Sequence, residues 1–265
     1  MRTNMKRTFG LCIALCLGLT AACVQVDVSV TSQDNSRALP PYPPMKPSIS
    51  MDDLKKLHTK KSCNSSSLTV DKEQQQTAAW CWAASTRMVM EYHNKTQRKP
   101  TDPQCDIVMN ILSNLPRSTN CCEKQEGPDF IDAPLKCRQG GWPHWVLEEY
   151  GFSYETVNTA FDWDALTREI CSIGPFISVI KWRGGGQHVF VVKGYHESTD
   201  EDFEPSSLAP LPLQFVEVYD PNLEDHLDMT LDEFEGDSPI KEYKYQLFSH
   251  TLDYVQIKPN AKDKP

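Results

Sequence analysis

The stretch Gln74-Gln75-Gln76-Thr77-Ala78-Ala79-Trp80-Cys81-Trp82-Ala83-Ala84-Ser85 places one cysteine between two tryptophans. Apolar residues recur every fourth position from Trp80, which predicts a helix over residues 77–93 with Cys81 near its start. Unpaired N–H groups and a partial positive charge at a helix N-terminus favour a thiolate, and the thiolate is the nucleophilic form of cysteine. Cys81 is therefore a candidate nucleophile. A small cysteine packed in a core is the simpler alternative.

The N-terminus has the features of a secretory signal peptide over residues 1–22. A basic segment precedes an apolar run at residues 9–19, which is too short to span a membrane. The sequence Leu19-Thr20-Ala21-Ala22-Cys23 then resembles the cleavage box of bacterial lipoproteins, with Thr20 where leucine is more usual. We therefore expect a lipid on Cys23, and ordinary cleavage after Ala22 is the alternative.

The residue after Cys23 is Val24, not an acidic residue, which in Gram-negative lipoproteins favours the outer membrane. The expected location is the bacterial cell envelope, as an outer-membrane lipoprotein or as a periplasmic or secreted protein. Residues 23–60 are rich in proline and polar residues and are expected to form a tether. Residues 61–265 are expected to form the catalytic domain.

The composition argues against nucleic acid as a partner and limits how the protein could contact a membrane. A formal net charge of -9 over 265 residues argues against nucleic-acid binding, which needs clustered lysine and arginine. No segment after the signal is apolar enough to cross a bilayer, so contact with a membrane is expected only through Cys23. The oligomeric state is left open.

The cysteine count predicts one unpaired thiol. Of ten cysteines, two lie in the predicted signal and Cys23 is expected to carry lipid. The seven others are Cys63, Cys81, Cys105, Cys121, Cys122, Cys137 and Cys171. In an oxidising compartment an odd number leaves one thiol free, and we expect it to be Cys81. The pairing of the other six is left open, except that adjacent Cys121 and Cys122 are expected to pair with different elements. No CxxC spacing supports a zinc site.

The order of predicted elements indicates an α+β fold. Helical patterns come first, at residues 77–93, from residue 101, at 143–150 and at 162–171. Strand patterns follow at residues 176–182, 188–192, 215–219 and 254–257. Helices followed by strands are typical of a two-part α+β protein. Four further tryptophans are expected mainly in the core, with a substrate groove as the alternative: Trp142, Trp145, Trp163 and Trp182.

A base and an orienting acid follow Cys81 in the chain. His188 opens a strand after three glycines, and Asp220 ends the next predicted strand. Neighbouring antiparallel strands can bring these two ends together, so that Asp220 would hold the imidazole and favour its charged form. The alternatives are a half-buried strand histidine and an Asp-Pro turn. The polar segment between them leaves Asp200 and Asp202 as other candidates for the acid.

Three sequence segments together resemble the papain-like cysteine peptidases. They are Cys-Trp-Ala-Ala at 81–84, His-Val-Phe-Val-Val-Lys-Gly-Tyr at 188–195 and Val-Tyr-Asp-Pro at 218–221. The resemblance covers about residues 70–258 and points to a bacterial branch that includes plant-pathogen effector proteases and neighbours bacteriocin-processing peptidases. It implies a two-lobed α+β fold with a helical N-terminal lobe, which carries the nucleophile helix, and an antiparallel β C-terminal lobe.

The resemblance also implies a glutamine whose side chain helps to bind the oxyanion, six residues before the nucleophile. That residue is Gln75, or Gln74 or Gln76 if the register of the loop differs. With the Cys81 backbone N–H, the glutamine would stabilise the negative oxygen of a tetrahedral intermediate.

The predicted function is a thiol-dependent endopeptidase with a Cys81–His188–Asp220 triad, acting on a peptide or protein substrate. It is expected to need no cofactor and no metal. One alternative is an acyl transferase of the transglutaminase-like type, which uses the same residue order. The other is a catalytically inactive binding module with the same fold.

Overall fold

The computed structural model describes residues 45–58, 63, 66–94, 102–112, 115, 119–123, 133–198, 213–236, 238–240, 242–243 and 247–260. The expected signal peptide and Cys23 lie outside these residues. Within the described part of the chain, no helix is both long enough and apolar enough to span a membrane.

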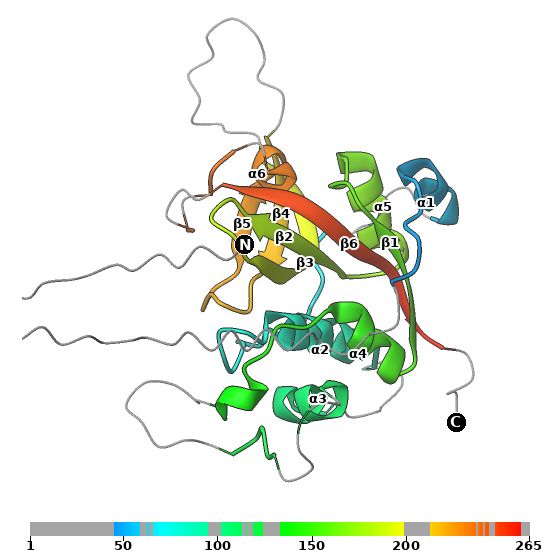
Figure 1. The fold of residues 1–265 in the computed structure, drawn as a ribbon. Helices are drawn as coiled ribbons and strands as arrows, with labels where there is room; N and C mark the ends of the chain where they lie inside the picture. The colour runs from blue at the N-terminus through cyan, green and yellow to red at the C-terminus, as the bar shows by residue number, and fades with distance from the viewer. Residues whose placement is uncertain are drawn as a thin grey trace, which may run out of the picture. The chain divides into compact units, whose positions relative to one another are not determined.

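The nucleophile helix is α2 (Cys81–Asn94), and it is buried along most of its length. Small residues at Ala83 and Ala84 allow close packing, and the Ser85 hydroxyl donates to the Val189 carbonyl of the sheet at 3.0 Å. The helices α3 (Gln104–Ile111) and α4 (Pro143–Glu149) pack beside it, after a short 3-10 helix η1 (Leu135–Cys137). Figure 1 shows α2, α3 and α4 grouped on one side of the sheet.

The second half of the chain forms a six-stranded antiparallel sheet. Its strands are β1 (Phe152–Val157), β2 (Phe176–Trp182), β3 (Gln187–Ser198), β4 (Leu213–Tyr219), β5 (Leu227–Thr230) and β6 (Phe248–Pro259). The order across the sheet is β1-β6-β2-β3-β4-β5. The register pairs Val191 of β3 with Tyr219 of β4, so that the start of β3 lies beside the residues that follow β4.

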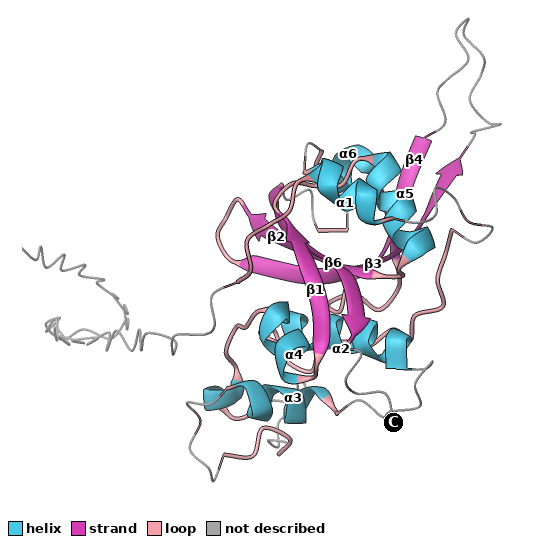
Figure 2. Cartoon of the chain, turned by 90° about the vertical axis from the view of Figure 1, so that its right-hand side faces the viewer, coloured by secondary structure: helices cyan, strands magenta, loops and turns pink. Residues whose placement is uncertain are grey.

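Both faces of the central strands are buried, because helices cover each side. Ile177 and Val179 join the apolar cluster under α2, α3 and α4, whereas Phe176 and Ile180 join the cluster on the opposite face. That face is covered by α1 (Met51–Leu57), α5 (Trp163–Ser172) and α6 (Leu231–Glu235), as Figure 2 shows. Because successive side chains point to opposite faces, a strand buried on both faces is apolar at most positions, as β2 is from Phe176 to Ile180.

The described part of the expected tether is packed against the domain. Leu54 of α1 is fully buried, and the Ile49 N–H donates to the Thr156 carbonyl at 2.8 Å. His58, at the end of α1, forms a buried contact with Glu169 of α5, with 2.6 Å between Nε2 and Oε2. Within this stretch, an apolar residue and a buried histidine therefore dock α1 on α5.

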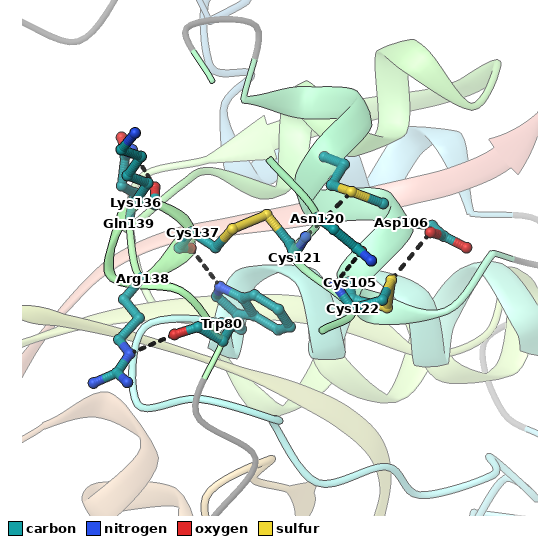
Figure 3. Close-up of a disulfide and its surroundings, with 12 residues drawn as sticks. Trp80, Cys105, Asp106, Asn120, Cys121, Cys122, Lys136, Cys137, Arg138 and Gln139 are labelled. Carbon is teal, nitrogen blue, oxygen red and sulfur yellow. Dashed lines mark hydrogen bonds between the residues drawn. A yellow bond between two sulfur atoms is a disulfide. The ribbon is translucent and has the colours of Figure 1, made fainter. Parts of the chain in front are cut away.

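Three disulfides leave Cys81 as the unpaired cysteine among the described residues. The pairs are Cys63–Cys171, Cys105–Cys122 and Cys121–Cys137. This agrees with the predicted free thiol and with different partners for Cys121 and Cys122. Figure 3 shows that the Cys121–Cys137 bond lies next to Trp80, whose indole N–H donates to the Cys137 carbonyl at 2.8 Å.

The predicted α+β class is confirmed, and the predicted elements agree except at some ends. The helix expected from residue 77 begins at Cys81, and two strands, β1 and β5, had not been predicted. β6 begins at Phe248, six residues before its predicted start. β1 and β5, and the first residues of β6, form strands because they pair with strands that are distant in the sequence. Local sequence patterns do not indicate such pairing.

The lengths of the loops that the disulfides close predict which bond contributes more to the free energy of unfolding. Cys63–Cys171 closes a loop of 108 residues and Cys121–Cys137 one of 16. Replacing both cysteines of the first pair by alanine should lower the free energy of unfolding by about 4 to 5 kcal/mol, and of the second by about 3 kcal/mol, because the longer loop restricts the unfolded chain more. Urea unfolding of the two double variants measures both losses. Equal losses would contradict this order.

Candidate active site

The thiol of Cys81 lies at the first residue of α2 and is only 9% exposed. The first turn of the helix holds no acidic residue to offset its partial positive charge. Trp80 and Trp82 fix this end of the helix by donating to the carbonyls of Cys137 at 2.8 Å and Gln139 at 3.3 Å. The tryptophans that flank the cysteine therefore anchor the helix start to the segment before α4.

The same segment approaches Trp82 so closely that only glycine fits at Gly141. A Cβ atom there would lie 2.5 Å from the Trp82 ring, well inside a van der Waals contact. The ring cannot move away freely, because Trp82 is 1% exposed and packs edge-on against Trp145. The environment of Cys81 is thus rigid on this side.

His188 is the second residue of β3 and lies between Asp220 and Cys81. Its Nε2 is 2.8 Å from Oδ1 of Asp220, and Cys81 lies close enough to the ring to help raise the pKa of His188. The register of β3 and β4 explains the first contact, because it brings the start of β3 beside the residue after β4. With Nε2 used by Asp220, Nδ1 is the nitrogen left for Cys81. The structure therefore brings together the three residues that the sequence proposed as a triad.

Asp220 is fully buried and accepts three hydrogen bonds. Besides His188, its Oδ1 accepts from the Asn222 N–H at 2.6 Å, and its Oδ2 accepts from the Tyr243 hydroxyl. Burial alone would raise the pKa of Asp220, but the hydrogen bond and charge of His188, together with the other two donors, outweigh it and lower the pKa. Asp220 is therefore an ionised carboxylate in the folded protein.

The carboxylate in turn keeps His188 charged. Burial of the ring opposes the positive charge, but the hydrogen bonds to Asp220 and Cys81 outweigh burial and raise the pKa of His188 to about 10. In the unfolded chain the pKa would be about 6.5. The interaction therefore stabilises the fold fully below about pH 6.5, and this contribution is lost as the pH rises through about 10.

Two aromatic residues cover the His188–Asp220 pair. The Trp182 ring, at the end of β2, is stacked on His188 with 6.2 Å between ring centroids, and Tyr243 meets Trp182 edge-on at 5.0 Å. They limit the access of water to the hydrogen bond, which strengthens it. The contact of Tyr243 was not predicted, because a lone tyrosine beyond the strands carries no motif or spacing that would signal it.

Gln75 lies next to the turn that follows Asp220. Its backbone N–H donates to the Pro221 carbonyl at 2.8 Å, whereas Gln74 is exposed. The Gln75 side-chain Oε1 is buried and has no hydrogen-bond partner among the described residues. An unpaired buried acceptor costs about 1 to 3 kcal/mol, whereas an oxyanion would be bound by the hydrogens on Nε2 of the same side chain. The two other candidate acids, Asp200 and Asp202, lie outside the described residues.

An unpaired cysteine at a helix start, beside a histidine held by a buried carboxylate, is the arrangement of a thiol hydrolase. Residues 64–238 match the family model described as papain-like cysteine protease AvrRpt2, and the chain belongs to this family. The predicted family is thereby confirmed, and the protein is a cysteine peptidase.

Two solved structures are similar to this chain at low sequence identity. A double-glycine motif protease from an AMS/PCAT transporter, solved with its leader peptide, is 15% identical over 74% of this chain and 96% of its own, with a TM-score of 0.36. Procathepsin B S9 from Trypanosoma congolense is 13% identical over 79% of this chain and 82% of its own, with a TM-score of 0.40. No curated protein sequence matches the chain.

The charge on His188 can be measured directly. We expect the imidazole to keep its proton at about pH 8 in the wild type, because the ionised Asp220 holds the pKa of His188 near about 10. Asp220→Asn removes that charge and should let the ring titrate at a lower pH. NMR of the histidine ring protons and nitrogens follows the titration. Tyr243→Phe is the matched control, since it removes one donor to Asp220 but leaves the carboxylate charge. Identical titrations in the wild type and Asp220→Asn would contradict the assignment.

Proposed function

We propose that this chain is an exported cysteine endopeptidase that uses Cys81 as the nucleophile, His188 as the base and Asp220 as the residue that orients His188. The observation that carries the proposal is the contact of one buried imidazole with both the unpaired thiol and an ionised carboxylate. A core cysteine or a turn-forming aspartate would not need such a partner. Family membership supports the same chemistry.

Each side chain of the site has a role in one step of peptide-bond hydrolysis. His188 Nδ1 holds the proton that leaves the Cys81 thiol, and the sulfur attacks the carbonyl carbon of the scissile peptide bond. The Cys81 N–H and the Gln75 amide bind the negative oxygen that forms. His188 then gives its proton to the departing amine as the C–N bond breaks. Water, deprotonated by His188, attacks the acyl-enzyme and releases the acid, and the thiol is restored. Asp220 holds the ring in one orientation throughout.

Other outcomes for the acyl-enzyme define the alternatives. If an amine replaced water in the last step, the protein would be an acyl transferase, and a peptide carrying the added amine would appear among the products. An inactive binding module would show neither product. The unpaired Cys81 beside a charged imidazole supports a catalytic role over an inactive module, and the products then separate hydrolysis from acyl transfer, which would use the same residues.

Alkylation and hydrolysis test the triad together. Iodoacetamide should label Cys81 faster than a free cysteine, and His188→Ala should slow labelling at least tenfold, since the partner that takes the proton is lost. Cys81→Ala should abolish cleavage of unfolded casein. His226→Ala is the matched control, because this side chain is 58% exposed and belongs to another part of the chain. A labelling rate that is the same in wild type and His188→Ala would contradict the proposal.

Anchoring by lipid is a separate part of the proposal. A signal peptide over residues 1–22 and a lipid on Cys23 would hold the enzyme at the outer membrane of a bacterial cell envelope. Cys23→Ser should then move the protein from the membrane fraction into the soluble periplasmic or secreted fraction, with its peptidase activity unchanged. If wild type and variant distribute equally in the soluble fraction, ordinary cleavage after Ala22 is the correct alternative.

A further inference from the structure

A second glutamine, far from the glutamine run in the sequence, holds the loop that carries Gln75. Gln104 is the first residue of α3 and is fully buried. Its Oε1 accepts from the Gln76 N–H at 3.0 Å, and its Nε2 donates to the Gln74 carbonyl at 2.8 Å. One amide thus binds the backbone on both sides of Gln75 and uses its acceptor and a donor to do so.

The remaining backbone contact of this loop comes from a different element. The Gln75 N–H donates to Pro221, in the turn that follows Asp220. The loop is therefore held between α3 and the Asp-Pro turn, with one hydrogen bond at each of three consecutive residues. These contacts restrict the dihedral angles of Gln75 and with them the direction in which its side chain leaves the backbone.

The start of α3 is itself held against the loop. Arg87 of α2 donates to the Asp102 carbonyl at 2.9 Å and pairs with the Glu73 carboxylate. The neighbour of Gln104, Cys105, is bonded to Cys122. Gln104 therefore projects from a fixed position, and its distance to the loop does not depend on a flexible segment of the described chain.

We propose that Gln104 is a positioning residue for the oxyanion donor Gln75, an inference that rests on the function proposed above. A donor stabilises the transition state only if it is already placed where the negative charge develops, and a displacement of about 1 Å can cost about a hundredfold in rate. Glutamine is seldom fully buried. An apolar residue could fill the same volume, but it would leave the Gln74 carbonyl and the Gln76 N–H without these partners. Both atoms of the Gln104 amide are needed.

A small activated ester tests the inference without knowledge of the natural substrate. With 4-nitrophenyl acetate, the Cys81 sulfur attacks the acetyl carbon, the C–S bond forms through an oxyanion, and the C–O bond breaks to release 4-nitrophenolate. The acetyl thioester is then hydrolysed by water. Alkylation of the same thiol by iodoacetamide displaces iodide from carbon and forms no oxyanion. The ester reaction therefore depends on the oxyanion site, and the alkylation reports only on the Cys81–His188 pair.

The variants are Gln75→Ala, Gln104→Met, the two combined, and Gln104→Glu, with Gln214→Met on β4 as the matched control. Gln104→Met keeps the length of the side chain and removes its hydrogen bonds. Gln104→Glu keeps an acceptor for the Gln76 N–H, but its carboxylate cannot donate to the Gln74 carbonyl. If the methionine variant does not fold, this variant still tests whether Gln104 positions Gln75.

We expect Gln75→Ala to slow release of 4-nitrophenolate about a hundredfold and Gln104→Met at least about tenfold. The combined variant should be no slower than Gln75→Ala alone, because the two residues act through one group. Iodoacetamide labelling should stay within about twofold of wild type in all of them, which general loss of structure would not allow.

Three results would overturn the inference, and each has a different meaning. If Gln75→Ala slows the ester reaction and both Gln104 variants do not, Gln104 does not position the donor. If Gln75→Ala has no effect while Cys81→Ala is inactive, Gln75 is not the oxyanion donor and Gln104 has nothing to position. If Cys81→Ala reacts with the ester as fast as wild type, the proposed function itself fails.

Discussion

The structure depends on one buried hydrogen bond between unlike charges, from His188 to Asp220. Removing two charged groups from water costs free energy unless each is paired and hydrogen-bonded. Here both oxygens of the Asp220 carboxylate accept hydrogen bonds. The stacked Trp182 then keeps water away at little cost, because no charge beneath it is left unsatisfied. The strand register, the turn after β4 and the aromatic cover all serve to bring this pair together and to keep it dry.

The nucleophile is held by different means from its base. α2 carries Cys81 on a helix that the core surrounds, so the thiol cannot move independently of the helix packing, the two tryptophan hydrogen bonds or Gly141. The base comes from the sheet. A papain-like arrangement therefore joins two rigid bodies, helix and sheet, and the reactive atoms lie where they meet. Little of this rigidity comes from the reacting residues themselves.

Sequence reasoning found those residues that carry a local pattern. Cys81 was marked by its flanking tryptophans, and His188 and Asp220 by their places at strand ends; Gln75 came only from resemblance to a family. The contacts of Tyr243 and Gln104 could not have been predicted, since each joins segments with no periodicity or spacing in common. The same limit explains the missed strands β1 and β5, and the packed helix α1 within an expected tether. Their structure depends on partners elsewhere in the chain.

The disulfides impose a redox requirement on a protein that also keeps a free thiol. Among the described cysteines, one sulfur must stay reduced while six are oxidised. A reductant that protects Cys81 from oxidation also threatens Cys105–Cys122, whose second sulfur belongs to an exposed residue and whose first adjoins Gln104. The range of redox potentials in which the protein keeps both states therefore has an upper and a lower limit. Oxidation of Cys81 would remove its free thiol, and reduction of Cys105–Cys122 would remove the covalent bond next to Gln104.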